Sequence, residues 1–175
     1  MAERLKLMKE YSDFTRDNYF IDQARIKSLE SPCFKSKVGS IIVRHNKIIS
    51  DGINMAPPNQ KNCEQIGFCY RIANNIQSGT RLNECRAFGC HAEQNAINNA
   101  AKNGISTDGA TMYIYGNTEI CTACRSSLTR AGIRRVVYMS KFGEMEKIDV
   151  WYEWNINPLD QKRKFEEWKE NIDKN

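Results

Sequence analysis

The fold is decided by residues 111–139, which read TMYIYGNTEICTACRSSLTRAGIRRVVYM. Residues 111–115 and 135–139 are rich in β-branched, aromatic and other apolar side chains, as strands are. Between them, residues 124–131 have the pattern of a helix, and Gly132 closes it. Two strands joined by a helix within so short a span are expected to pair in parallel through a right-handed crossover.

Upstream of this unit, the patterns predict a helix, a two-stranded hairpin and a second helix, at residues 3–29, 38–43 with 47–53, and 92–103. We expect a break in the first helix near Ser12-Asp13. The order helix, hairpin, helix, strand, helix, strand predicts a three-layer α/β domain.

The length of 175 residues predicts a single domain over residues 1–175. Residues 55–90 are an irregular stretch with prolines, glycines and four cysteines, which we interpret as an ordered insertion. Residues 155–175 predict a C-terminal helix that packs on the body or on a partner chain. No apolar run approaches the roughly 20 residues of a membrane span, and the N-terminus does not resemble a signal peptide. A cytoplasmic location is therefore expected.

The charge does not identify a partner, but the cysteines are informative. A net charge of +5 is compatible with nucleic acid or with a phosphorylated small molecule. Seven cysteines are an odd number, which argues against a disulfide framework and favours metal ligation.

Two short segments carry the ligands that zinc prefers: His91, which opens one predicted helix, and Cys121 with Cys124, which open another. A spacing of three lets both sulfurs face one point. The positive ends of the two helices favour thiolates there. Three protein ligands leave one position open, as in a catalytic zinc site, and zinc lowers the pKa of a bound water to about 7. Glu93 can take the proton of that water.

At these residues the chain resembles the cytidine and deoxycytidylate deaminase superfamily, whose signature is H-x-E followed by P-C-x-x-C. Residues 91–97 (HAEQNAI) are similar to H-A-E-x-N-A-I, residues 131–138 (AGIRRVVY) to A-G-I-x-x-V-V-Y, and residues 31–40 (SPCFKSKVGS) to S-x-C-x-R-x-x-V-G-A. Residues 17–20 (DNYF) look like the start of the first helix in bacterial and phage deoxycytidylate deaminases, so the resemblance covers about residues 17–140.

The resemblance implies a three-layer α/β/α cytidine-deaminase-like fold with a central mixed five-stranded sheet. It assigns zinc to His91, Cys121 and Cys124 and proton transfer to Glu93. The implied reaction is hydrolytic attack at ring carbon 4 of cytosine with release of ammonia. The expected substrate is a small nucleotide, deoxycytidylate (dCMP), which becomes deoxyuridylate (dUMP). Family members are often homo-oligomers, and we expect one here.

A second, structural zinc is also implied, because some members use cysteines from the V-G-A segment and the following insertion. Four cysteines fall in those regions here and would make a closed site: Cys33, Cys63, Cys69 and Cys85. The alternative is that some of them are free buried cysteines that pack as small hydrophobes. Cys90 is interpreted as a packing residue.

The chain departs from the family pattern around the expected substrate pocket. The G-Y-N-G-x-P segment keeps Asn54 but has Ile53 and Met55 in place of the tyrosine and the second glycine. Ile120 replaces the proline before the first cysteine. By resemblance, Asn54 is expected to hydrogen-bond the sugar or base.

A phosphate needs cationic or backbone donors, and Lys35 and Lys37 are the nearby candidates. One alternative function is deamination of a nucleic-acid base, such as a tRNA adenosine or a single-stranded cytosine; another is deamination of a different free base, nucleoside or nucleotide. A third is a zinc-stapled module without turnover, against which the retention of Glu93 argues.

Overall fold

The computed structural model describes residues 2–116, 119–140, 142–150, 169, 170 and 172, with side chains from Ser12 onward. The helix predicted for residues 155–175 falls largely outside the described residues. In the described part of the chain, no helix has the length and apolar character needed to cross a membrane.

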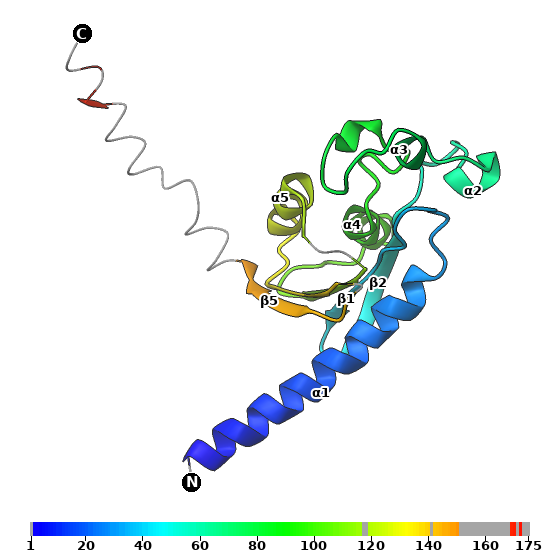
Figure 1. Ribbon diagram of the computed structural model, residues 1–175. Helices are drawn as coiled ribbons and strands as arrows, with labels where there is room; N and C mark the ends of the chain where they lie inside the picture. Colours follow the sequence, from blue (N-terminus) through cyan, green and yellow to red (C-terminus); the bar gives the residue numbers. More distant parts are fainter. Residues whose placement is uncertain (1, 117–118, 141, 151–168, 171, 173–175) are drawn as a thin grey trace.

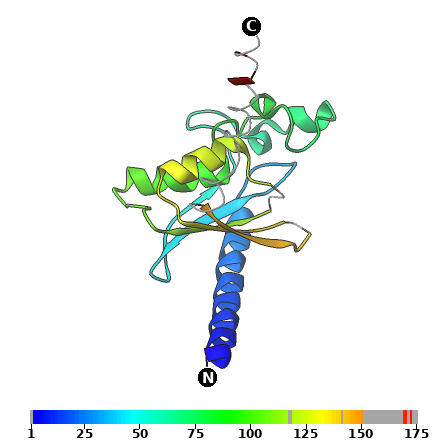
Figure 2. The same ribbon diagram turned by 90° about the vertical axis from the view of Figure 1, so that its left-hand side faces the viewer.

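The centre of the fold is one five-stranded sheet with strand order β2-β1-β3-β4-β5 (Figures 1 and 2). Its strands are β1 (Gly39–Arg44), β2 (Lys47–Ile53), β3 (Thr111–Tyr115), β4 (Arg135–Met139) and β5 (Met145–Asp149). Neighbouring strands run antiparallel, except that β3 and β4 are parallel. The predicted mixed sheet and the predicted parallel pair are therefore confirmed.

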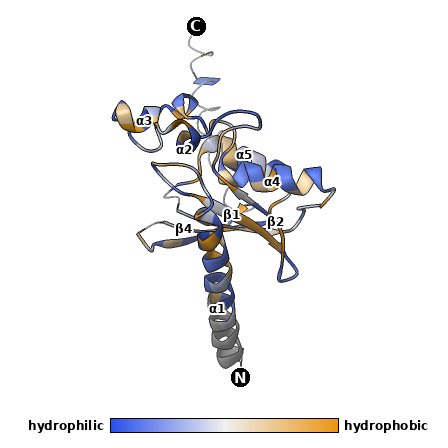
Figure 3. Ribbon diagram, turned by 90° about the vertical axis from the view of Figure 1, so that its right-hand side faces the viewer, coloured by the Kyte–Doolittle hydropathy of each residue, from blue (hydrophilic) through white to orange (hydrophobic). Residues whose placement is uncertain are grey.

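Helices cover both faces of the sheet, so the three-layer prediction is confirmed. On one face lie α4 (Ala92–Lys102) and α5 (Thr122–Arg130), and on the other lies α1 (Ala2–Ser28) (Figure 2). Side chains alternate along a strand, so β3 and β4 supply both cores: Met112, Ile114 and Val136 pack with α4 and α5, while Tyr113 and Val137 pack with α1. In Figure 3, hydrophobic residues run through the strands between the helical layers.

The first helix is continuous from Ala2 to Ser28, so the predicted break near Ser12-Asp13 is wrong. No glycine or proline interrupts this stretch. Asp13 instead pairs with Arg16 at 2.6 Å, one turn along the same helix, which is a spacing that supports helical structure.

The predicted hairpin is confirmed, and one strand was not predicted from the residue pattern. His45 and Asn46 join β1 to β2 with φ angles of 50° and 59°, and a two-residue hairpin turn with both residues in the left-handed region matches the twist of the strands. Strand β5 contains only two apolar side chains, Met145 and Ile148. It is a strand because its backbone pairs with β4.

The cysteine-containing segment of residues 55–90 holds three short helices: α2 (Cys63–Ile66), α3 (Tyr70–Ala73) and the 3₁₀ helix η1 (Leu82–Glu84). In Figure 1 this segment lies above α4, at the opposite end of the molecule from the N-terminal turns of α1.

Close backbone packing fixes α4 against β1 and β2. A Cβ atom on Gly52 would lie 2.4 Å from both the Ala92 oxygen and the Ala96 nitrogen, so only glycine permits this approach. The buried Ser40 hydroxyl donates to the Ala92 oxygen at 2.7 Å, and the Asn95 amide donates to the Ile53 oxygen at 2.8 Å. These contacts set the position of the residue that precedes α4, which is His91.

Candidate functional site

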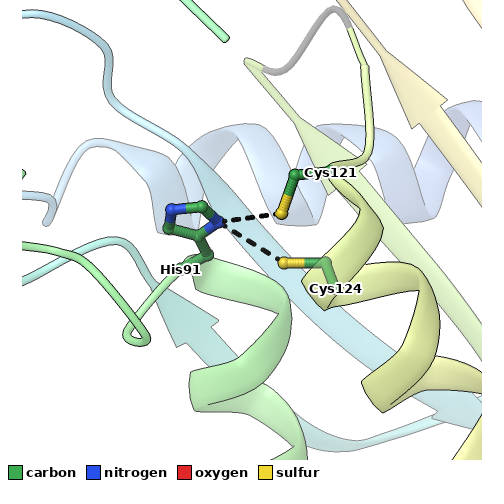
Figure 4. A group of neighbouring side chains, drawn as sticks. All are labelled: His91, Cys121 and Cys124. Atoms are coloured by element: carbon green, nitrogen blue, oxygen red, sulfur yellow. Dashed lines mark hydrogen bonds between the residues drawn. The ribbon is translucent and has the colours of Figure 1, made fainter. Parts of the chain in front are cut away.

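Three side chains that the sequence analysis assigned to one metal lie together at the N-terminal ends of α4 and α5 (Figure 4). His91 and Cys121 are the residues that precede the two helices, and Cys124 lies in the first turn of α5. The Nδ1 atom of His91 is 3.5 Å from the Cys121 sulfur and 3.4 Å from the Cys124 sulfur. The three ligand atoms all lie within 4.8 Å of one another.

This spacing fits a zinc ion. Ligands at about 2.1 Å for nitrogen and 2.3 Å for sulfur in a tetrahedral arrangement are about 3.6 Å apart. Both sulfurs of the trio approach the same ring nitrogen, which has only one proton or one lone pair to offer. A single zinc ion between the three atoms can bind all of them at once. Hydrogen bonds cannot, because the two sulfurs would compete for the same ring nitrogen.

The electrostatics of the trio also suit a thiolate ligand. The pKa of Cys121 is lowered to about 4, chiefly because the Cys124 side chain donates a hydrogen bond to its sulfur and because His91 does the same. The pKa of Cys124 is raised by that same hydrogen bond and by burial. The pKa of His91 is raised, mainly by its hydrogen bond to Cys121. One sulfur therefore loses its proton readily beside an imidazole.

Glu93 lies in the first turn of α4, two residues after His91. Its side chain is only 1% exposed, yet it borders the same cleft as His91 and Cys121. It also forms a hydrogen bond with the Cys124 side chain, which contributes to the raised pKa of that thiol. The structure therefore brings together all four residues that the sequence analysis assigned to the catalytic site.

The cleft beside the trio has a volume of about 1310 Å³, which exceeds the 300–1,000 Å³ of most small-molecule pockets. His91, Glu93 and Cys121 line it, and much of the remaining wall comes from the insertion. Three partly exposed aromatic rings also border it: Tyr70, Phe88 and Phe142.

Asn54 follows β2, is 9% exposed and borders the cleft. Its side-chain oxygen accepts hydrogen bonds from the Ser31 hydroxyl at 2.7 Å and from the Val38 N–H at 2.9 Å. Its side-chain nitrogen donates to the Ser36 oxygen at 2.9 Å. Asn54 thus ties the segment after α1 to the end of β2, and only its second amide N–H is left over from these bonds.

The four cysteines predicted to bind a second zinc all border the cleft. The pKa of Cys63 is raised to about 11, first by burial and then by the charges of Cys69 and Cys33, so these sulfurs are neighbours. Backbone N–H groups bond two sulfurs: the Ser36 N–H lies 3.5 Å from the Cys33 sulfur, and Ala87 donates to Cys85. Among the described residues, however, only the His91 trio has three ligand atoms all within 4.8 Å.

The two lysines named as phosphate candidates differ in position. Lys35 borders the cleft and hydrogen-bonds the Ile76 oxygen. Lys37 is not among the cleft-lining residues and donates to the backbone oxygens of Leu29 and Ser31, at 3.2 and 2.5 Å. The sequence analysis did not single out Arg71, which borders the cleft and is 5% exposed. No motif marks it, because it is an isolated arginine in an irregular stretch.

The fold and the trio together define a zinc-binding α/β/α protein with its metal ligands at two helix N-termini. Residues 14–140 match the family described as the cytidine and deoxycytidylate deaminase zinc-binding region, and the chain belongs to this family.

Individual relatives agree with the family match. The deoxycytidylate deaminase of Schizosaccharomyces pombe is 32% identical over 126 residues, which are 72% of this chain and 37% of that protein. The deoxycytidylate deaminase of Enterobacteria phage T4 is 32% identical over 147 residues, and the match covers 68% of this chain and 75% of the phage protein. The chain thus spans well under half of the yeast relative.

A solved structure has the same fold. The dCMP deaminase from the cyanophage S-TIM5, crystallised in complex with dCMP and dUMP, superposes with a TM-score of 0.54 at 28% identity. The match covers 70% of this chain and 79% of the cyanophage chain. It supports the assignment of a cytidine-deaminase-like fold.

Proposed function

We propose that this chain is a zinc-dependent hydrolase that converts dCMP and water into dUMP and ammonia. The observation that carries the proposal is the His91, Cys121 and Cys124 trio with the buried Glu93 beside it, where His91, Cys121 and Glu93 border one cleft. The yeast and phage relatives are deoxycytidylate deaminases, and the cyanophage relative binds dCMP and dUMP.

The trio would hold the zinc ion through one nitrogen and two sulfurs. When bound, the ion lowers the pKa of water to about 7 and makes it a nucleophile near neutral pH. Glu93 accepts one proton of the attacking water and delivers it to ring nitrogen 3. It then takes the second proton of that water from the new hydroxyl on carbon 4 and delivers it to the amine, so that ammonia departs as the carbonyl forms. Its burial keeps the carboxylate in a low-dielectric environment, where its charge acts more strongly than in water.

Several further assignments belong to this proposal. Asn54 contacts the sugar or base through its remaining amide N–H. Cys33, Cys63, Cys69 and Cys85 hold a structural zinc, supported by their shared wall of the cleft and by the N–H groups that bond two of the sulfurs. Residues 1–175 form one cytoplasmic domain with residues 55–90 as its insertion.

A homo-oligomer is also part of the proposal. In Figure 1, the N-terminal turns of α1 extend beyond the sheet that the rest of the helix covers. Two aromatic side chains of α1, Phe14 and Tyr19, are 54% and 58% exposed. Exposed apolar side chains on one helix are compatible with a contact to a second copy of the chain.

The test is an ultraviolet and ammonia-release assay of the zinc-loaded chain. The panel contains dCMP, dCTP, cytidine, deoxycytidine, guanine and a short single-stranded oligonucleotide. We expect one ammonia per dUMP formed and the highest kcat/KM for dCMP. Turnover of the oligonucleotide with none of dCMP would move the protein to the nucleic-acid class, and no turnover of any cytosine compound would contradict the proposed reaction.

A further inference from the structure

Two cations hold one stretch of the cleft wall through its backbone oxygens. The guanidinium of Arg71, on α3, donates to the carbonyl oxygens of Gln77 at 2.8 Å, Thr80 at 2.7 Å and Arg81 at 2.6 Å. Lys35 bonds the oxygen of Ile76 in the same stretch. Residues 76–81 are therefore folded around two positive charges that come from different parts of the chain.

The charge of Arg71 is only partly balanced in the described part of the chain, because it acts on Glu84 and Cys85 without an ion pair to either. Arg71 is 5% exposed and forms no ion pair with a described carboxylate. Glu84 is influenced by the charge of Arg71, but its two oxygens are both bonded by Arg81, at 2.6 Å each. Carbonyl dipoles solvate a buried guanidinium without neutralising it, and buried charges are normally paired.

Arg71 also keeps donors for a ligand. A guanidinium has five N–H groups, and the three carbonyl bonds use three of them. Two donors, the Nε–H and one Nη1–H, remain on a rigid, permanently charged group, and charge-assisted hydrogen bonds from arginine to phosphate are strong. Arg71 and Lys35 border the same cleft as His91 and Glu93.

We infer that Arg71, together with Lys35, binds the phosphate group of the substrate and so makes the site select a nucleotide over a nucleoside. The inference rests on the proposed function for the identity of the nucleotide. The base lies at His91, Cys121 and Glu93, while the phosphate lies beside Arg71 and Lys35, which border the same cleft. Arg71 then has two roles: it determines substrate specificity, and it holds residues 76–81 in place through its hydrogen bonds to their backbone oxygens.

The decisive experiment compares kcat/KM for dCMP and for deoxycytidine in the zinc-loaded wild type and in the Arg71→Gln variant. Loss of charge-assisted hydrogen bonds is expected to lower the value for dCMP by roughly 10- to 100-fold. The value for deoxycytidine should stay within about threefold. An equal loss of kcat/KM for both substrates would mean that Arg71 only stabilises the conformation of residues 76–81, and this would overturn the inference.

Arg86 provides the matched control, because it is another arginine of the cleft wall but is exposed and bonds only the Lys61 oxygen, at 3.2 Å. Arg86→Gln is expected to leave both substrates within about threefold. If the ratio of kcat/KM for dCMP to that for deoxycytidine fell in Arg86→Gln but not in Arg71→Gln, the phosphate would bind at Arg86 and not at Arg71, and the inference would be wrong. If Arg71→Gln does not fold, Lys35→Gln takes its place, and an unchanged preference for dCMP in it would overturn the subsite.

Binding measurements separate this inference from the proposed function. If the wild type does not turn over dCMP, the proposed reaction fails, but calorimetry with dCMP, deoxycytidine and inorganic phosphate still tests Arg71. A loss of roughly tenfold or more in dCMP affinity in Arg71→Gln, with deoxycytidine affinity unchanged, supports the phosphate subsite. Equal dCMP affinities in the wild type and the variant would refute it.

Discussion

The carboxylate of Asp17 accepts hydrogen bonds from both terminal nitrogens of Arg135, at 2.9 and 2.7 Å, although 118 residues separate the two in the chain. Lys147 adds an ion pair at 2.8 Å, and the Tyr113 hydroxyl donates at 2.9 Å. Asp17 itself is fully buried. This one side chain therefore connects α1 to β3, β4 and β5 on the face of the sheet opposite the cleft.

The first prediction concerns Asp17→Asn. Burial works to raise the pKa of Asp17, but the hydrogen bonds and charge of its partners, Arg135 first, outweigh it and lower the pKa to about 2. The variant leaves two cations without their partner, and both are partly exposed. We expect a loss of about 2–4 kcal/mol in the free energy of unfolding at pH 7, measured by urea denaturation.

The pH dependence of that loss follows from the sign of the shift. The folded pKa lies below the unfolded value, so the carboxylate stabilises the fold above about pH 4 and stops doing so as the pH falls toward 2. The difference between wild type and variant should shrink by about 2 kcal/mol over this window. Metal binding changes with pH in both proteins, so only the difference is compared.

Asp22→Asn is the control for this prediction. Asp22 lies on the same helix and pairs with Arg25 at 3.1 Å, but its side chain is 59% exposed. The stability of this variant should stay within about 0.5 kcal/mol of wild type. Equal effects of Asp17→Asn and Asp22→Asn would contradict the role given to the buried carboxylate.

The second prediction uses the fact that the chain has only two histidines. His91→Asn should lose one equivalent of zinc, because it removes the nitrogen that faces both sulfurs. His45→Asn should keep all of it, since His45 is exposed in the hairpin turn and asparagine tolerates its φ of 50°. Zinc content is measured by elemental analysis after dialysis. Equal zinc content in the two variants would refute the trio.

The third prediction concerns proton transfer by Glu93. Glu93→Gln keeps the size of this buried side chain, so zinc content and folding should be unchanged. The turnover rate should fall by roughly a hundredfold or more, because the amide cannot accept and pass on a proton. Glu119→Gln is the control: Glu119 also borders the cleft but is 79% exposed. A Glu93→Gln variant as active as Glu119→Gln would rule out the proposed proton transfer.

The fourth prediction concerns the number of zinc ions. The wild type should hold two per chain, and Cys63→Ser should hold one and keep the zinc of the trio. Cys90→Ser is the matched control, because Cys90 adjoins His91 but was assigned to packing. A wild type with one zinc, or a Cys90→Ser variant that loses as much metal as Cys63→Ser, would argue against the four-cysteine site.

Local patterns were sufficient for much of the site. His91, Glu93, Cys121 and Cys124 could be assigned from the sequence because ligand type, spacing and helix starts are local properties. The structure then placed His91, Glu93 and Cys121 at one cleft, with the Cys124 sulfur beside them. Proximity in sequence did not predict the position of Lys37. Lys35, two residues earlier, borders the cleft, whereas Lys37 bonds backbone oxygens outside it.

Other features depend on contacts that the sequence does not reveal. Strand β5 has a weak strand pattern and forms because β4 offers it a pairing edge. The continuity of α1 through Ser12-Asp13 overrides the tendency of these residue types to interrupt helices.

The sequence by itself determined the three-layer arrangement and the zinc trio, because hydrophobic periodicity and the spacing of metal ligands are properties of short segments of the sequence. Only the tertiary structure decided which distant charges meet. It paired Asp17 with Arg135, and it buried Arg71 in the cleft wall without a carboxylate partner among the described residues. The physical reason is that the energy of a charge depends on its burial and its neighbours, and packing sets both.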